Sequence, residues 1–495
     1  MKYVRVPGEI PSGDIRQEGA CFSPGRYVRF VPEGKDGKAR YESLDKLVIV
    51  RKSKVKPDKG ETYNYAEIGD IDVATGGVVF RRLRGYQLPT KTPIEVRKND
   101  VLLSTVRTYR GGIGWVSSDD QQSVASNAIM NFCGVTDYVP GLTLQYVYSF
   151  LRSDFFIEQV WSLLNRGLYP RVERDALDKI LIPIPEDWQK IELVTGLTQA
   201  IIDKESMIRV LHRKILDTLH SELTGGRTAE DFHYAHPTVD DIRILNRLDT
   251  GLYCREFKSF KHLVDNYESG STCLSKLGVR SRRGPNLAVS VLGNSSISKQ
   301  PKPDNWYQLI RPVNITEYGT LAKREWLGTK RKLPLLKKGD IVLGCEGFEK
   351  GRTFVVMEEI EKCTTNFHGT VLFWPEAEMR RIIALRCYLA YLRFRGIIDL
   401  VGVGGSGGHM SPEYFDCLPI PVLPESIESD IAECYSSGLQ PLKESVSPRN
   451  LIEVHRGRNE ESGIWELDRE MRELQSTLRQ IQENIIRGEK ARIAS

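Results

Sequence analysis

The sequence has no long apolar segment and no paired cysteines. No run of about 18 or more apolar residues occurs among its 495 residues, so a membrane-spanning helix is not expected. The nine cysteines occur singly and none forms a CxxC pair, which argues against a structural zinc site. The N-terminal residues contain no apolar core of a signal peptide. We therefore expect a cytoplasmic protein with reduced thiols.

The sequence also lacks the usual motifs of nucleic-acid enzymes. It contains no N-P-P-Y or D-P-P-Y tetrad of a methyltransferase and no G-x-x-x-x-G-K-[ST] phosphate loop. The glycine-rich stretch 402–408 lacks the lysine of such a loop and predicts a flexible connection. One nuclease-like spacing occurs, Asp249 followed by Glu256 and Lys258, but strings of this kind are common by chance. We therefore expect no catalytic residue and no metal ligand in this chain.

Basic residues are clustered more than the net charge suggests. The net charge of +5 is weak evidence in a chain of this length. Three clusters, at 81–84, 280–283 and 330–332, each lie close to Gly or Pro, which predicts loops. Basic loops suit contacts with the phosphates of a nucleic acid. For any single cluster, a solvated loop without such a contact is an equally good interpretation.

The strongest pattern is an internal repeat. The segment 98–104 (KNDVLLS) matches 338–344 (KGDIVLG), and a turn with Gly and basic residues follows each. Each half then ends in a Pro-containing strand, at Pro185 and Pro421. Other segments match in the same order: 22–30 with 248–257, 65–77 with 309–319, 126–132 with 366–373, and the apolar helical stretches 142–164 with 380–400.

The offsets between matched landmarks are similar. They are 226 residues for Tyr27 and Tyr253, 240 for Asp100 and Asp340, and 236 for Pro185 and Pro421. Landmarks in one order with such close offsets indicate a duplication followed by insertions and deletions in loops. In each half, short apolar strands bounded by Gly and charge precede a helical stretch. The predicted fold class is therefore α/β (mixed α+β), with two tandem domains.

Two further segments have helical heptad patterns. Residues 188–223 carry an apolar stripe with a slip near Glu205, and the stripe 464–485 steps by three and four residues without a slip. A helix with one narrow apolar stripe needs a partner, so we expect the two to pair as an antiparallel coiled coil; packing of each on its own domain is the alternative. The seam residues are Ile191, Val194, Ile201, Ile208, Leu211, Ile215, Leu219, Ile464, Leu467, Met471, Leu474, Leu478, Ile481 and Ile485.

These elements divide the chain into five predicted parts. They are a first domain at 1–187, a central coiled-coil spacer helix at 188–224, a second domain at 225–424, a linker with a partial helix at 425–461, and a C-terminal coiled-coil helix at 462–490. Pro441 and Pro448 predict the break inside the linker. A helix over 188–223 is about 54 Å long at about 1.5 Å per residue, which is enough to hold two domains apart.

This order of elements resembles the specificity (S) subunits of type I restriction–modification systems. The resemblance covers nearly the whole chain, and it depends on the order of its loose motifs. The chain departs from the family's pattern in the short segment before Phe22 and in the long, Pro-broken connection 425–460. The matching features are the IPIP-type strands Ile182–Pro185 and Leu418–Pro421, the helix after each, the KNDVLLS and KKGDIVLG segments, and the RLDTGLYCREF opening at 247–257.

The resemblance implies a role without catalysis. Two target-recognition domains would each read one half of a split site in double-stranded DNA. The two helices, through the seam residues above, would set the gap between the halves and dock two methyltransferase (M) subunits. S-adenosylmethionine would bind to these partners and no cofactor to this chain, and a motor–nuclease (R) subunit would join in a complex for phage defence.

The candidate DNA contacts are basic, polar and aromatic residues on predicted loops. Arg and Lys suit base edges as well as phosphates, and Gly111 and Gly112 allow close approach of the backbone. His409 lies on a loop that matches Tyr169 in the first half. The candidates are Arg81, Arg82, Arg84, Arg107, Thr108, Tyr109, Arg110, Arg166, Tyr169, Arg171, Arg280, Arg282, Arg283, Lys330, Arg331, Lys350, Arg352 and His409.

Two other functions are compatible with the sequence. A structural adaptor of a DNA-modifying complex would hold other subunits without reading DNA, and it would show no sequence preference. A nuclease with an unrecognised site would use the string formed by Asp249, Glu256 and Lys258, and it would lose activity when Asp249 or Glu256 is replaced.

Overall fold

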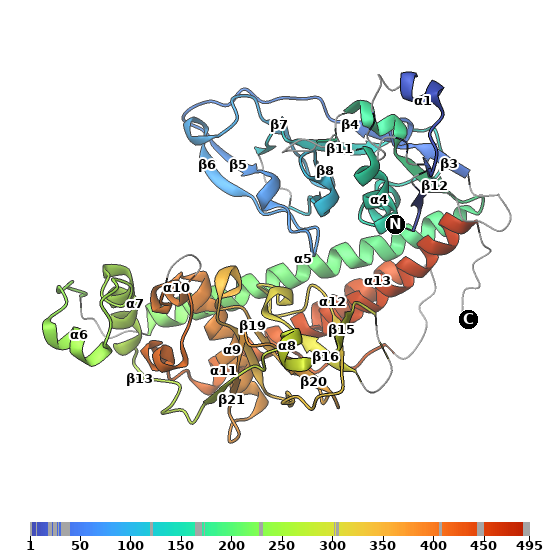
Figure 1. Cartoon of the computed structure of the whole chain (residues 1–495). Coiled ribbons are helices and arrows are strands. Elements are labelled where there is room, and N and C mark those ends of the chain that lie inside the picture. The colour runs from blue at the N-terminus through green and yellow to red at the C-terminus, as the bar shows by residue number, and fades with distance from the viewer. Residues whose placement is uncertain are drawn as a thin grey trace. The chain divides into compact units, whose positions relative to one another are not determined.

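The computed structural model of the chain describes residues 2–5, 7–17, 22, 27, 29–30, 40–118, 122–163, 171–172, 174–226, 231–300, 302, 306–404, 408–442 and 450–488. This part of the chain forms two compact units. Unit 1 consists of Met1–Met207, Pro441–Glu460 and Leu467–Ser495, and unit 2 of Ile208–Gln440 and Glu461–Glu466. In Figure 1 the sheets of unit 1 are blue to cyan, and those of unit 2 are yellow to orange.

Unit 1 contains two four-stranded sheets in its described part. Their orders are β4-β11-β8-β9 and β6-β5-β10-β7, and β12 pairs with β3 and β1 with β2. The neighbours β5 and β10 are parallel and the other pairs are antiparallel. The strands are β1 (Val4–Arg5), β2 (Arg29–Phe30), β3 (Arg40–Ser43), β4 (Val48–Val50), β5 (Thr62–Ala66), β6 (Arg81–Arg84), β7 (Ile94–Glu95), β8 (Val101–Ser104), β9 (Ile113–Trp115), β10 (Ser123–Ala125), β11 (Ile129–Val135) and β12 (Leu181–Ile184).

The helical elements of unit 1 that precede α5 are short. They are α1 (Ser12–Gln17), α2 (Leu44–Leu47), η2 (Ile68–Asp70), η3 (Gly85–Gln87), η4 (Thr108–Arg110), α3 (Leu144–Leu151), α4 (Asp154–Leu163) and η5 (Arg174–Lys179), and the first part of α5 (Trp188–Gly225) follows them. The Thr143 hydroxyl accepts a hydrogen bond from the Tyr146 N–H (3.1 Å), and it thereby caps the start of α3.

The strand β8 shows why the sheets of unit 1 pack as they do. Its first three residues are apolar without alternation, and all four, including the polar Ser104, are at most 1% exposed, as expected for a strand covered on both faces. Leu102 packs in one cluster with Ala125 of the other sheet. In the same sheet as β8, Trp115 of β9 lies against Tyr148 of α3, with ring centroids 5.4 Å apart. The core of unit 1 therefore lies between its two sheets, and α3 packs against β9.

Unit 2 contains sheets of the orders β14-β21-β18-β19 and β15-β17-β16-β20, and β13 pairs with β22. One apolar cluster joins the sheets, with Val342 and Val371 from the first and Ile310 and Cys363 from the second. The strands are β13 (Ser271–Thr272), β14 (Arg280–Arg283), β15 (Ser295–Ser298), β16 (Tyr307–Ile310), β17 (Glu325–Thr329), β18 (Ile341–Gly344), β19 (Thr353–Val355), β20 (Cys363–Thr365), β21 (Gly369–Phe373) and β22 (Ile420–Pro421).

The helical elements of unit 2 precede, separate and follow these strands along the chain. They are the second part of α5, α6 (Val239–Leu245), α7 (Arg255–Asp265), α8 (Val289–Leu292), η6 (Pro312–Asn314), η7 (Gly347–Glu349), α9 (Met379–Phe394), α10 (Ile397–Val401), η8 (Pro412–Cys417) and α11 (Glu425–Tyr435). Two helices close the chain, α12 (Leu451–Glu461) and α13 (Ile464–Arg487), and most of both belongs to unit 1.

The predicted internal repeat is present in the strand pairing. The sheets β4-β11-β8-β9 and β14-β21-β18-β19 have the same order and the same directions. The pair β8–β11 sets Ser104 opposite Ile129, and β18–β21 sets Gly344 opposite Gly369, each 240 residues later. The parallel pairs β5–β10 and β16–β20 also correspond. The matched segments 98–104 and 338–344, and likewise 126–132 and 366–373, therefore contribute equivalent strands, whereas most of the segment 22–30 lies outside the described residues.

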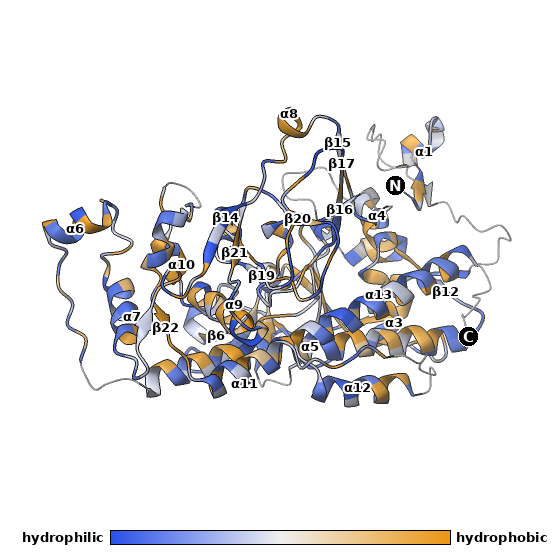
Figure 2. Cartoon of the chain, turned by 90° about the horizontal axis from the view of Figure 1, so that it is seen from below, coloured by the Kyte–Doolittle hydropathy of each residue, from blue (hydrophilic) through white to orange (hydrophobic). Residues whose placement is uncertain are grey.

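Unit 2 differs from unit 1 by an insertion between β14 and β16. The insertion contains α8 and β15, and β15 adds a strand to the edge of the second sheet beside β17. In Figure 2 α8 is coloured hydrophobic and lies beyond the end of β15 and β17. Val289 of α8 is 72% exposed and Ile297 of β15 is 53% exposed. Insertion in a loop is the kind of divergence expected between duplicated halves.

The predicted antiparallel helix pair is present in unit 1. Figure 1 shows α13 alongside the N-terminal part of α5 and running in the opposite direction. Lys204 of α5 and Glu470 of α13 form an ion pair of 2.7 Å, and Arg456 of α12 lies 2.9 Å from Asp203 of α5. The seam residues predicted from the heptads are at most 9% exposed, except Leu211, which is half-buried. Because these side chains are buried inside the chain, a partner would have to contact the outer faces of the helices.

The polar faces of α13 are less exposed than the heptad pattern suggests. Glu466 is 2% exposed, and its carboxylate accepts hydrogen bonds from the Ser436 hydroxyl and from the N–H groups of Ser437 and Gly438. The N–H of Gly463 donates to the same carboxylate. This side chain therefore fixes the chain after α11 to the start of α13 in unit 2. The predicted limits of the five parts remain a prediction.

Candidate nucleic-acid interface

The turn after β8 in unit 1 and the turn after β18 in unit 2 share left-handed residues at two matched positions. Arg107, which precedes η4, and Gly347, the first residue of η7, both have left-handed conformations, with φ of 53° and 62°. Gly111 and Gly351, which follow them, have φ of 81° and 79°. A left-handed conformation suits Gly and is unfavourable for other L residues, so Arg107 is the exception among these four.

The turn in unit 1 presents some of its predicted DNA contacts and buries one. Thr108 is fully buried, and its hydroxyl donates to the carbonyl oxygen of Ser104 (2.6 Å). The prediction that Thr108 contacts DNA is therefore wrong. Tyr109 is half-buried, with its ring edge-on to Trp161 at 4.7 Å between centroids. Arg110 is exposed and remains a candidate.

The turn in unit 2 presents a residue that the sequence analysis did not select. Phe348 is 92% exposed at this turn. The Lys350 side chain is 7% exposed and its ammonium lies 3.1 Å from Asp399 Oδ1, so the prediction that Lys350 contacts DNA is wrong. Arg352 is half-buried and donates to the carbonyl oxygen of Ile315 (2.9 Å).

Two of the three basic clusters are edge strands, which corrects the prediction of loops. The cluster at 81–84 is β6 and the cluster at 280–283 is β14, each at the edge of a sheet. Side chains alternate along a strand, so Leu83 packs in a cluster with Tyr63 while Arg82 and Arg84 are exposed. The third cluster lies in the turn after β17, as predicted.

Some of these basic side chains are neutralised by acidic neighbours. Arg81 lies 2.8 Å from Glu67 and 3.0 Å from Asp70. Arg282 lies 3.6 Å from Asp340, whose pKa burial nonetheless raises above its ordinary value. Arg84 donates to a backbone carbonyl. Within the described residues, the exposed candidates that make no ion pair are Arg82, Arg84, Arg110, Arg171, Arg280, Lys330 and Arg331.

The third predicted loop is described in part. Arg166 and Tyr169 lie outside the described residues. Arg171 is exposed and forms an antiparallel bridge with Val106, and His409 forms the same bridge with Glu346. The register therefore sets Arg171 of unit 1 at the place of His409 in unit 2, which corrects the match of His409 with Tyr169.

A cavity that the sequence analysis missed lies beside His409. Its volume is about 740 Å³, and it is formed entirely by unit 2. The structure brings acidic, amide and imidazole groups together here from three separate loops. The polar residues that line it are Arg311, Glu346, Glu349, Asn366, His368 and His409.

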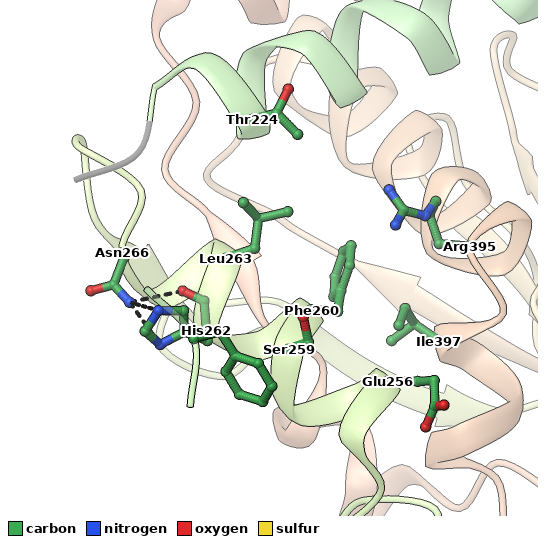
Figure 3. A pocket seen from close by; sticks show the side chains of 10 residues that line it. Thr224, Glu256, Ser259, Phe260, His262, Leu263, Asn266, Arg395 and Ile397 are labelled. Atoms are coloured by element: carbon green, nitrogen blue, oxygen red, sulfur yellow. Dashed lines mark hydrogen bonds between the residues drawn. The ribbon is translucent and has the colours of Figure 1, made fainter. Parts of the chain in front are cut away.

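A second cavity of unit 2 contains Glu256 from the nuclease-like string. Figure 3 shows its lining side chains from the end of α5, from α7 and from the region of α10, and the volume is about 400 Å³. Glu256 is the one carboxylate in this lining. The Asp249 carboxylate is held by the Arg247 guanidinium (2.6 Å), and Lys258 donates to the carbonyl of Ala235 (3.0 Å). The string therefore does not converge on one point.

Metal-ligand clusters and membrane-spanning helices are absent from the described residues. No group of three or more His, Cys, Asp or Glu side chains there is arranged to hold a metal ion. No described helix combines the length and the apolar character needed to cross a bilayer. The cysteines at 133, 254, 273, 345, 363, 387, 417 and 434 are unpaired thiols, which agrees with the prediction of reduced thiols for these positions.

Comparisons with known proteins return solved structures only. No family model and no curated protein matches the chain. A chain from a structure that describes complex assembly and conformational transition of the type I R-M system is 16% identical over 92% of this chain and 98% of that chain, with a TM-score of 0.30. The HsdS subunit from Thermoanaerobacter tengcongensis is 15% identical, with the same shares covered and a TM-score of 0.31.

The type I restriction-modification S subunit from M. genitalium is 12% identical over 92% of this chain and 97% of that chain, with a TM-score of 0.37. The similar solved structures are thus components of the type I systems whose S subunits the sequence resembles.

Proposed function

We propose that this chain is the DNA-binding specificity subunit of a type I restriction–modification-like complex and that it reads a bipartite target. The observation that carries the proposal is the duplicated two-sheet unit, in which the same turn follows β8 and β18 with different side chains. A duplicated scaffold with divergent turns suits the recognition of two different short sequences. Linking two such readers in one chain raises affinity and specificity without a large single interface.

The exposed basic residues give each unit the means to hold DNA. Arg82 and Arg110 of unit 1, and Arg280, Lys330 and Arg331 of unit 2, are exposed cations suited to phosphate contacts. Such contacts fix register and supply most of the salt dependence of binding. Base reading then falls to side chains at the equivalent turns, which both units present.

We further propose that two methyltransferase subunits dock on the outer faces of α5, α12 and α13. The apolar seam is occupied inside the chain, while exposed residues such as Val210 (57%) remain on the outside of α5. S-adenosylmethionine would bind to these partners, and this chain would take no part in the chemistry. A motor–nuclease subunit would complete a phage-defence complex in the cytoplasm.

The test is selection of bound sequences from a randomised double-stranded DNA pool. The full chain is used alone and together with its methyltransferase (M) partner. We expect two short specified sequences separated by a gap of fixed length. One continuous motif would show that a single unit reads DNA. No enrichment in either sample, at a salt concentration that suppresses non-specific binding, would refute the proposal and favour a structural adaptor.

A further inference from the structure

The cavity beside His409 is rich in groups that accept hydrogen bonds. Glu346 contributes a carboxylate that is 28% exposed. Within the described residues, the buried Oδ1 of Asn366 has no hydrogen-bond partner, and neither does Nδ1 of His409, which lies 3.6 Å from Glu346 Oε1. Buried polar atoms are rarely left unsatisfied, so these atoms indicate a place that a ligand would complete.

The cations near this cavity are already engaged. The Arg311 guanidinium donates to both carboxylate oxygens of Glu325, at 2.7 Å each. Arg283 lies 2.5 Å from Glu346 Oε1, and His368 is hydrogen-bonded to the other oxygen of Glu346. These contacts orient the Glu346 carboxylate, and they leave unoccupied lone pairs on oxygens that accept more than one hydrogen bond each. A ligand group that donates hydrogen bonds fits this lining best.

Unit 1 carries a different set of residues at the same place. The backbone identifies the equivalents: the N–H of Thr105 donates to the carbonyl oxygen of Ala128 (2.9 Å), and that of Cys345 donates to His368 (3.0 Å). Backbone hydrogen bonds also match Arg171 with His409. The N–H of Val172, which follows Arg171, donates to the carbonyl oxygen of Thr105, and the N–H of Met410, which follows His409, donates to that of Cys345, both at 2.8 Å. The equivalents of Glu346, Asn366, His368 and His409 are therefore Val106, Ser126, Ala128 and Arg171.

The two sets differ in hydrogen-bonding character. Val106 and Ala128 offer no side-chain acceptor, Ser126 has a hydroxyl that both donates and accepts, and the exposed Arg171 is a donor with a fixed fork. In the major groove, Arg suits the two acceptors of guanine, whereas Glu accepts from the amino group of cytosine and amides suit adenine. The duplicated scaffold therefore places a donor in one unit where the other has acceptors.

We propose that this place determines base specificity in both units. The cavity of unit 2 accepts hydrogen bonds from the exocyclic amino group of adenine or cytosine, whereas Arg171 of unit 1 donates hydrogen bonds to guanine. The inference rests on the proposed DNA-reading function and adds the class of base and the residues that read it. A purely structural role for the contacts of Glu346 is the competing interpretation.

The experiment repeats the pool selection with the full chain and three variants. Glu346→Gln removes the charge and keeps the shape, Asn366→Ser introduces the residue of the equivalent place in unit 1, and Arg171→Ala removes the donor. We expect both unit 2 variants to lose about tenfold or more of the discrimination at one adenine or cytosine position of a single half-site, which is the scale of one base contact. Arg171→Ala should relax one guanine position of the other half-site only.

The outcomes separate this inference from the function on which it rests. A bipartite motif that stays unchanged at every position in Glu346→Gln and in Asn366→Ser would overturn the inference and leave the function intact. An equal loss of affinity for all sequences, with no change in base preference, would also overturn the inference, because it would indicate lost folding or lost phosphate contacts. Melting temperatures identify a variant that fails to fold, and Asn366→Ser, which breaks no hydrogen bond of the Asn366 Oδ1 atom, then decides. No motif for the wild-type chain would overturn both proposals.

Discussion

The ammonium of Lys204 lies 2.7 Å from Glu470 Oε2 in the interior of the helix pair of unit 1, where the two side chains are 0% and 2% exposed. The Asn459 side-chain oxygen accepts from the same ammonium (2.8 Å), and Arg458 pairs with the other oxygen of Glu470. Burial alone would raise the pKa of Glu470, but the hydrogen bonds from Arg458 and Lys204 outweigh it, so this pKa lies below its ordinary value. Glu470 is therefore charged at neutral pH, whereas burial lowers the pKa of Lys204 although its hydrogen bond with Glu470 opposes this.

The first prediction concerns this pair. Lys204→Met leaves part of the Glu470 charge uncompensated in a buried place, so we expect the free energy of unfolding to fall by about 3 kcal/mol. Urea denaturation followed by circular dichroism measures the change. Arg243→Met is the control, because Arg243 and Asp240 form a pair that is 76% and 80% exposed. A loss in Lys204→Met no greater than in the control would contradict the prediction.

The second prediction concerns pH. Burial, with repulsion from Lys204, lowers the pKa of His455 from 6.5 to about 4, despite Glu470 at 3.9 Å. Between these values the unfolded chain binds a proton at this residue and the folded chain does not, so stability falls as the pH drops from 6.5 to about 4. We expect the melting temperature of His455→Gln to fall less over this range than that of the wild type. The exposed His236→Gln is the control, and equal slopes in all three proteins would exclude His455 as a cause.

Sequence periodicity predicted what depends on local patterns. The apolar run of β8 and the heptads of α13 follow from side chains close together in the chain, and both are buried as expected. The repeat was visible because β8 and β18 retain similar residues at an offset of 240. These features therefore identified the fold class and the duplication.

Long-range pairing decided what the sequence could not show. The basic residues of β14 form a strand because Arg280 pairs with Phe373 of β21, far along the chain. Lys350 is buried, and its ion-pair partner Asp399 lies far along the chain in α10. The Glu346 and His409 bridge likewise joins two loops whose sequences give no sign of contact. Composition near Gly and Pro is a poor guide to such positions, and the acidic cavity was missed for the same reason.

The third prediction separates strain from function at Arg107. Arg107 and Asn99 both hold left-handed conformations with φ of 53° and 67°, at places where unit 2 has Gly347 and Gly339. Such a conformation costs a non-Gly residue roughly 1–2 kcal/mol, so we expect Arg107→Gly and Asn99→Gly to keep or raise the melting temperature. Only Arg107→Gly should weaken DNA binding and reduce the slope of log affinity against log salt by about 1.

Asn99→Gly is thus the matched control for Arg107→Gly. Affinity measured by fluorescence anisotropy at several salt concentrations gives the slope. If both variants weaken binding equally, the backbone conformation and not the guanidinium is responsible, and Arg107 is no phosphate contact.

The fourth prediction compares the contribution of one equivalent hydrogen bond in each unit to the free energy of unfolding. Tyr146 of α3 and Tyr388 of α9 are buried, and their hydroxyls donate to the carbonyl oxygens of Pro183 and Pro419, both at 2.7 Å. Burial raises the pKa of both phenols well above the ordinary value, so both stay neutral and act as donors at any working pH. Replacement by Phe leaves each buried carbonyl without this donor.

We therefore expect Tyr146→Phe and Tyr388→Phe to lower the free energy of unfolding by similar amounts, about 1–1.5 kcal/mol each. Calorimetry measures the loss, and the exposed Tyr86→Phe should leave the transition unchanged. The two sites lie in different units, so their effects should add in the double variant. A cost in one unit and none in the other would mean that the repeated hydrogen bond no longer serves the same structural purpose in both halves, even though the strands around it still correspond.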